Sequence, residues 1–178
     1  MEKEKKEYIA TVTKVVRDSL NLSTPIDLES LVEKLGGTLS YTNTIENDKE
    51  AKIEKKEDSF EIYIDKNKSE TRKRFSIAHE IGHLFLHMGY LLNPKKWEST
   101  NDYVDSVYYR YGYNIEEHEA NEFAAHLLMP NEEFQEVSQK NFNDASKKYD
   151  INKIASHFNV SEDAAFTKGK LMGLFEGY

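Results

Sequence analysis

Residues 74–87 of the chain read Arg74-Phe75-Ser76-Ile77-Ala78-His79-Glu80-Ile81-Gly82-His83-Leu84-Phe85-Leu86-His87, and they decide its fold. Their apolar spacing predicts a helix from Glu70 to Met88, which carries the pattern HExxH at residues 79–83. Side chains four residues apart on a helix lie one turn above each other, so His79 and His83 can reach one metal ion with Glu80 beside them. This pattern is typical of zinc hydrolases, and chance would produce it in roughly 2% of such chains.

The predicted helix has two different sides. At about 100° of rotation per residue, one arc of about 100° contains His79, Glu80, His83 and His87. The opposite side carries Ile77, Ala78, Ile81, Leu84, Phe85 and Met88. We therefore expect one side to pack against the core and the other to carry chemistry. The alternative interpretation is an amphipathic helix whose histidines have only structural roles.

The composition is that of one globular domain. The chain has 178 residues, of which 38% are hydrophobic, and this length suffices for a buried core. Within one domain spanning 1–178 we expect N-terminal helices (1–37), a small sheet (38–66), metal-site helices with an intervening loop (70–130) and C-terminal helices (131–178). The absence of cysteine excludes disulfides, thiolate zinc sites and a cysteine nucleophile, so His, Asp or Glu must hold any metal.

Charge and hydropathy restrict the partners and the location. Lys and Arg number 24 and Asp and Glu 32, and the net charge of −8 gives no electrostatic reason to bind nucleic acid. The charged start, residues 1–7, lacks the apolar stretch of a secretory signal, and no run approaches the ~20 apolar residues of a membrane span. These features predict a cytoplasmic protein without a membrane partner.

The segments before residue 70 predict two helices and a small sheet. Helical spacing predicts one helix over residues 9–20 and a second over 24–35. β-type segments follow at 38–42, 51–56 and 60–65, the last two as a hairpin. We expect an α+β fold in which a small antiparallel three-stranded sheet packs on a predominantly helical body. An edge strand beside the metal-binding helix would let an extended peptide substrate add to the sheet.

A catalytic zinc site usually has three protein ligands and one open position, so the two histidines need a partner elsewhere. A helix predicted over 115–129 can supply it, because Glu117 lies on a face of mostly small residues. These residues are Ala120, Asn121, Ala124, Ala125 and Leu128. An unpaired carboxylate on such a contact face would be destabilising, so a cation is its natural partner. Glu119 lies on the opposite side with Glu122 and His126, where we expect exposure to solvent, and it is the second choice of ligand.

Three further residues are candidates beside the site. Asn121 lies one turn after Glu117 and can accept the N–H of a ligand histidine, which would fix its tautomer, although a capping or packing role is the alternative. His118 is either a donor to substrate at the border of the site or a surface histidine. His87 lies ~12 Å from His79 along a straight helix, too far to share the ion, so we expect it to line the site.

The stretch 89–114 is predicted to be irregular, and it is unusually aromatic. Its aromatic residues include Trp97, Tyr103, Tyr108, Tyr109, Tyr111 and Tyr113. One interpretation is a lid or specificity loop over the metal. The other is a cluster of aromatic side chains packed beneath a long loop.

Two stretches of the sequence resemble the ImmA/IrrE family of zinc metallopeptidases. One is residues 74–87 around HEIGH, and the other is 117–130, EHEANEFAAHLLMP, which is similar to the EANxFAAxLLMP segment of the family. The helix at 26–37 and the tail at 151–175 are similar to flanking family elements. The resemblance implies a zincin-like fold of the gluzincin type and a cytoplasmic peptidase that cleaves helix-turn-helix repressors.

The resemblance also implies a role for each residue of the site. His79, His83 and Glu117 would hold one catalytic Zn²⁺, and Glu80 would be the catalytic carboxylate that takes a proton from water and passes it to the leaving amine. The same two histidines and glutamate also accept manganese, iron or cobalt.

Two other functions remain as alternatives. Residues 151–171 predict a helix, a turn and a second helix, as in DNA-binding modules, but Glu162 and Asp163 at the start of the second helix oppose binding to phosphates. The fold could also serve as a regulator that binds a repressor without cutting it. The intact HExxH pattern together with Glu117 argues against that reading.

Overall fold

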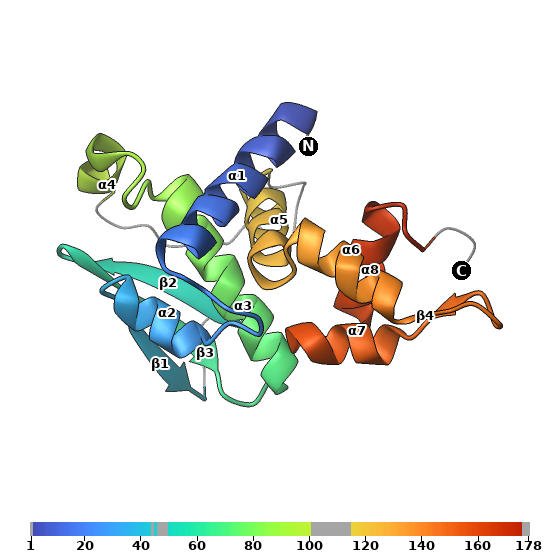
Figure 1. Cartoon of the computed structure of the whole chain (residues 1–178). Helices are drawn as coiled ribbons and strands as arrows, with labels where there is room; N and C mark the ends of the chain where they lie inside the picture. The colour runs from blue at the N-terminus through green and yellow to red at the C-terminus, as the bar shows by residue number, and fades with distance from the viewer. Residues whose placement is uncertain (1, 44, 46–49, 101–114, 176–178) are drawn as a thin grey trace.

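The computed structural model of the chain describes residues 2–43, 45, 50–100 and 115–175, arranged as in Figure 1. Its helices are α1 Lys3–Ser19, α2 Leu28–Lys34, α3 Glu70–Gly82, η2 His83–His87, α4 Pro94–Ser99, α5 Ile115–Leu128, α6 Asn131–Lys140, α7 Ile151–Phe158 and α8 Glu162–Leu171. Its strands are β1 Thr38–Thr42, β2 Ala51–Lys56, β3 Ser59–Asp65, β4 Phe142–Asn143 and β5 Lys148–Tyr149. The sheet and α2 lie at one end and α6 to α8 at the other, with α3 and α5 between them.

The larger sheet has the strand order β1-β3-β2. The α+β class is confirmed, but the expected antiparallel sheet is mixed, because β1 runs parallel to β3 while β2 runs antiparallel to it. A tight hairpin turn forces only β2 and β3 to run in opposite directions, and no such turn joins β1 to β3. Phe60, Ile62 and Ile64 of β3 alternate with more exposed residues and are at most 1% exposed, so one face of the sheet packs on the core.

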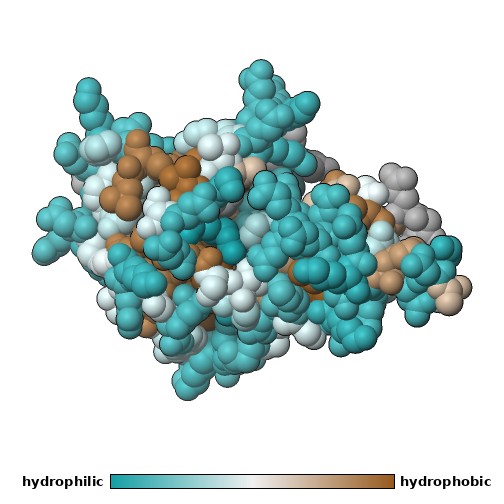
Figure 2. All heavy atoms as spheres, viewed as in Figure 1, coloured by the Kyte–Doolittle hydropathy of each residue, from teal (hydrophilic) through white to brown (hydrophobic). Residues whose placement is uncertain are grey.

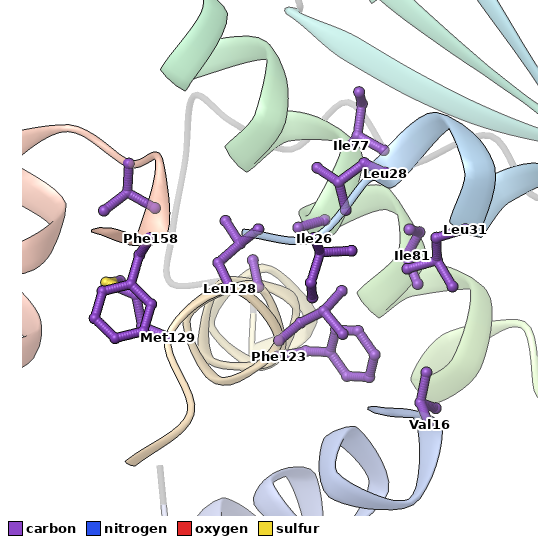
Figure 3. Close-up of a cluster of buried hydrophobic side chains, with 14 of the residues drawn as sticks. Val16, Ile26, Leu28, Leu31, Ile77, Ile81, Phe123, Leu128, Met129 and Phe158 are labelled. Atoms are coloured by element: carbon purple, nitrogen blue, oxygen red, sulfur yellow. The ribbon is translucent and has the colours of Figure 1, made fainter. Parts of the chain in front are cut away.

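The apolar side of α3 joins the sheet end to the helical part. Ile77 and Ile81 are buried in one cluster with Leu28 and Leu31 of α2 and with Phe123 of α5 (Figure 3). Burial of one such side chain stabilises the fold by about 1.5–3 kcal/mol. The apolar side predicted for this helix is therefore the side that packs, and the histidines lie on the other side.

The helix that carries HExxH begins where it was predicted but does not stay α-helical. Ser69 accepts a hydrogen bond from the backbone N–H of Arg72 at 3.4 Å, which caps the start of α3. Residues 83–87 form a π-helical turn, η2, in which the N–H of Met88 donates to the carbonyl of His83 at 2.9 Å. The prediction of an unbroken α-helix to Met88 was wrong here, since apolar spacing does not distinguish one wider turn from a regular one.

Gly82 lets α5 approach α3 closely. A Cβ atom added to Gly82 would lie 3.0 Å from the Cα atom of Ala120 and 3.2 Å from the Cβ atom of Phe123. Of the face predicted for α5, Ala120 and Ala124 are fully buried at this contact, whereas Asn121 and Ala125 are half-buried and line a cleft. Small side chains on both helices thus bring the start of α5 beside the histidines.

Two other bounds differ from the prediction. The second helix begins at Leu28, later than residue 24, because the Asp27 side chain accepts a hydrogen bond from the N–H of Ser30 at 3.0 Å and starts α2 there. The stretch 89–114 contains a short helix, α4, within the part that was predicted to be irregular.

The C-terminal part forms the predicted pair of helices. Asn159 adopts a left-handed conformation with φ of 52° and ends α7. Ser161 accepts a hydrogen bond from the N–H of Ala164 at 3.2 Å and starts α8. Since α8 buries Ala165 and Gly169, the face of the second helix that carries them is packed inside the protein.

The face of the molecule seen in Figure 2 is largely hydrophilic. Smaller apolar areas lie among the hydrophilic ones on this face (Figure 2). Leu91 and Leu92, in the turn before α4, are exposed. None of the helices in the described ranges combines the length and the apolar character that crossing a bilayer requires.

Candidate metal centre

The structure brings His79, His83 and Glu117 together. The Nε2 atoms of the two histidines lie 3.0 Å apart, and each lies close to one carboxylate oxygen of Glu117, at 3.2 Å for His79 and 3.4 Å for His83. One ligand atom from each residue lies within 4.8 Å of the others. Within residues 2–43, 45, 50–100 and 115–175, no other set of His, Asp and Glu side chains meets this condition.

The donor atoms of this cluster fit a cation. Both carboxylate oxygens of Glu117 are buried and neither receives a hydrogen bond, although two imidazole nitrogens are near. Burial raises the pKa of Glu117, but the two histidines lower it by more, so this pKa lies far below its usual value. Burial lowers the pKa of His79, and the nearby Glu117 and Glu80 carboxylates raise it by more, so the net shift is upward. These shifts mark a site that attracts positive charge.

Asn121 orients the first histidine. Its Oδ1 atom lies 2.9 Å from Nδ1 of His79. Because an amide oxygen only accepts hydrogen bonds, Nδ1 of His79 must carry a proton, so in the neutral imidazole Nε2 has the lone pair and faces Glu117 and His83. A ligand histidine that is held in this tautomer is ready to bind a metal ion.

His87 orients the second histidine. Its Nδ1 atom lies 2.9 Å from Nδ1 of His83, and its Nε2 atom lies 3.2 Å from a carboxylate oxygen of Glu119. A carboxylate accepts, so Nε2 of His87 donates to it, and Nδ1 of His87 then accepts the proton of His83 Nδ1. His83 therefore presents its Nε2 lone pair to the cluster. Burial and the neighbouring His83 lower the pKa of His87 to about 4, which keeps His87 neutral at pH 7.

The structure corrects the prediction for Glu119, which was expected to face solvent. Glu119 is only 7% exposed, and Nζ of Lys5 lies 2.9 Å from its carboxylate. The side of α5 opposite to Glu117 is covered by α1, which the helical-wheel argument could not place. The partner of Glu119 could not be predicted from the sequence, because a lysine in a charged N-terminal segment, such as Lys5, gives no sign of a buried partner.

The remaining candidates lie around the cluster. Glu80, next to His79 on α3, is 2% exposed. His118 is exposed and lines a cleft together with Asn121. His126 and His157 lie near Glu122 and Glu133, at 3.3 Å and 2.8 Å, and so pair with carboxylates outside the cluster.

Trp97 belongs to a packed group. Its ring contacts that of Tyr90 edge to face at 4.8 Å between centroids, and Nζ of Lys55 lies 4.5 Å above the Trp97 ring. Of the two interpretations of the stretch 89–114, this arrangement matches the packed aromatic cluster for Trp97. The other aromatic residues named for that stretch, Tyr103 to Tyr113, lie outside the described residues.

Comparisons with known proteins place the chain in a family. A family model described as the IrrE N-terminal-like domain, Peptidase M78, matches residues 33–167. Among solved structures, a Mycobacterium tuberculosis transcriptional regulator has a similar fold, with a TM-score of 0.59 and 13% sequence identity. The match covers 91% of this chain and 46% of that chain, and such an identity shows likeness of fold alone. None of the curated proteins matches. Because the family match spans most of its length, the chain belongs to the Peptidase M78 family of IrrE N-terminal-like domains, as the resemblance predicted.

Proposed function

We propose that this chain is a zinc-dependent endopeptidase that hydrolyses a peptide bond in a protein substrate. His79, His83 and Glu117 would hold one catalytic Zn²⁺, and Glu80 would be the catalytic carboxylate. The observation that carries the proposal is the convergence of two imidazole nitrogens and a buried carboxylate on one point, with the buried Glu80 next to His79 on α3. Two histidines and one glutamate are a common ligand set of catalytic zinc, and they leave one position open.

Each residue of the site would have its own role in hydrolysis. When bound at such a site, zinc lowers the pKa of water to about 7 and polarises a carbonyl group. Glu80 would accept the proton of the attacking water and deliver it to the leaving amine as the peptide bond breaks. Burial of Glu80 excludes bulk water from this carboxylate and so favours a defined path for the proton. Asn121 and His87 would keep the ligand histidines in the tautomers described above.

The substrate that we propose is a helix-turn-helix transcriptional repressor, and this rests on the resemblance to the ImmA/IrrE family. The edge strand β2 is a candidate place for the substrate backbone, since β2 pairs with β3 on one side only among the described strands. Its charged residues Lys52, Glu54 and Lys56 pair with one another, which protects the edge from pairing with other sheets. An extended segment of the substrate could still add to it through main-chain hydrogen bonds.

The direct test uses the helix-turn-helix regulator that is encoded nearest to this chain. The zinc-loaded protein is incubated with that regulator, and mass spectrometry looks for a new fragment. The matched control is Glu80→Gln, which should bind zinc normally and produce no fragment, a loss of about 10²–10⁴-fold in rate. Full activity of Glu80→Gln would overturn the mechanism. Binding of the regulator without a fragment would favour the non-catalytic regulator.

The helices α7 and α8 give little support to a DNA-binding function. The first turn of α8 carries Glu162 and Asp163, and the face of α8 with Ala165 and Gly169 is packed inside the protein. A helix that reads DNA needs a free face and basic residues toward the phosphates. A gel-shift assay at low salt that shows tight binding to duplex DNA would reverse this ranking.

A further inference from the structure

A large cleft begins beside the metal-site residues and extends to the C-terminal helices. Residues of α3, α5, the α7–α8 turn and α8 line it, and its volume is about 960 Å³, at the upper end of the range for ligand sites. Asn121 and His118 belong to its lining, and Asn121 also contacts His79. A molecule in this cleft would therefore lie next to the candidate metal centre.

One wall of the cleft presents a buried ammonium group. Lys168 of α8 lines the cleft and is only 6% exposed, and it makes no hydrogen bond or ion pair with any residue of the described ranges. Burial lowers the pKa of Lys168 to about 8, an effect that the nearby Glu122 opposes and Lys6 reinforces. A charged group in such a place is destabilising unless an opposite charge joins it.

The other charged groups of the cleft do not supply that partner. Glu122 lies close to His126, at 3.3 Å, and is not within ion-pair distance of Lys168. Asp163 is exposed in the first turn of α8. Lys6 and Arg72, which also line the cleft, are cationic themselves. Since no described residue of the cleft places an opposite charge at ion-pair distance from Lys168, an occupant that carries an anion would supply it.

The remaining lining describes the rest of the occupant. Apolar side chains of three elements face the cleft, among them Phe75, Ala125, Met129 and Val160. Such a lining favours apolar groups on either side of the anion. The volume of the cleft and the contact of its residue Asn121 with His79 suit a peptide segment better than a compact ion.

We propose that this cleft binds the peptide substrate and that Lys168 recognises an acidic side chain, Asp or Glu, flanked by apolar residues. The assignment rests on the proposed peptidase function for the identity of the occupant. It makes Lys168 a specificity residue that contacts substrate at a distance from the bond that is cut.

The test measures binding separately from hydrolysis. Peptides are selected from a random library on the immobilised Glu80→Gln protein, and each selected peptide is compared with its Asn or Gln counterpart by fluorescence anisotropy. We expect enrichment of Asp or Glu, and about tenfold weaker binding of the amide counterpart. In Glu80→Gln with Lys168→Met the acidic and amide peptides should bind equally. The control Lys170→Met, an exposed lysine on the same helix, should keep the preference.

The outcomes separate this assignment from the proposed function. No enrichment of acidic residues, or a preference that survives Lys168→Met, overturns the assignment. Octanoate serves as a second probe, an apolar molecule with one free carboxylate. If octanoate binds through Lys168 and the library yields no binding peptide, the assignment is also overturned, in favour of a small free carboxylate. Acidic peptides that bind through Lys168 but are not cut by the zinc-loaded protein with Glu80 intact support the assignment and overturn the peptidase. Lys168→Glu should bind Lys-containing peptides instead, which guards against a folding defect in the first variant.

Discussion

The Nδ1 atoms of His83 and His87, which lie on the same π-helical turn, are 2.9 Å apart, and His87 is the first step of a series of contacts that reaches α1. The connection continues through Glu119 to Lys5, at 3.2 Å and 2.9 Å. Through His87, the carboxylate of Glu119 determines which nitrogen of His83 carries the proton. Metal binding should therefore depend on residues that cannot touch the ion.

Replacement of Glu119 tests this dependence. Glu119→Leu removes the acceptor for His87, so His83 loses its fixed tautomer, and zinc affinity should fall by about 10–100-fold. Glu119→Gln keeps an acceptor and should lose less. Affinity is measured by competition with a chromophoric chelator, with the exposed neighbour Glu116→Gln as control. Unchanged affinity in Glu119→Leu would show that the contact has no influence on the ion.

Replacement of Glu117 tests the third ligand. Zinc at about 100 times its dissociation constant should stabilise the wild-type protein by about 2.7 kcal/mol, because the ion binds the folded state only. Glu117→Gln should lose most of this stabilisation, whereas Glu116→Gln should retain it. Chemical unfolding with and without zinc measures the difference. A full zinc effect in Glu117→Gln would transfer the third ligand to another residue.

Gly82→Ala tests the close contact of α3 and α5. Alanine favours a helix over glycine by about 1 kcal/mol. The added methyl group would nevertheless press on the backbone of Ala120, which cannot move away as a flexible side chain would. We expect net destabilisation of about 1–3 kcal/mol in urea unfolding, together with weaker zinc binding as Glu117 is displaced. A stabilised variant with normal zinc affinity would contradict this account.

The buried Lys168 should make stability depend on pH. Its pKa is about 8 in the folded protein against 10.5 for an ordinary lysine, so the unfolded state binds more protons between these values. The free energy of unfolding should therefore rise from pH 8 to 10.5, by up to about 3 kcal/mol from this residue. Lys168→Met should be more stable than wild type at pH 7 and should lack this part of the rise. Lys170→Met provides the comparison, and an identical pH profile for Lys168→Met and wild type would refute the claim.

The sequence by itself determined the local parts of this protein. The HExxH pattern and the apolar residues around it predicted that His79, Glu80 and His83 lie on one side of one helix. The small residues around Glu117 predicted a face that contacts another helix. These inferences hold because the side-chain periodicity of a helix is a local property that the order of residues alone specifies. The α+β class and the family followed from similarly local patterns, and both are confirmed.

Only the tertiary structure decided which elements pack against these local parts and which of their residues are buried. In the folded protein α1 covers Glu119. This residue, which was expected on the surface, therefore contacts both Lys5 and His87. The fold also contains the π-helical turn at His83 and the parallel pairing of β1. The cover over Glu119 and the pairing of β1 arise from contacts between residues distant in the sequence, and neither periodicity nor residue type reveals which distant element will pack at a given place. The π-helical turn is local, but apolar spacing does not distinguish it from a regular turn. The burial of Lys168 is another feature that only the tertiary structure decided, because it is the packing of α8 that places this side chain in the wall of the cleft.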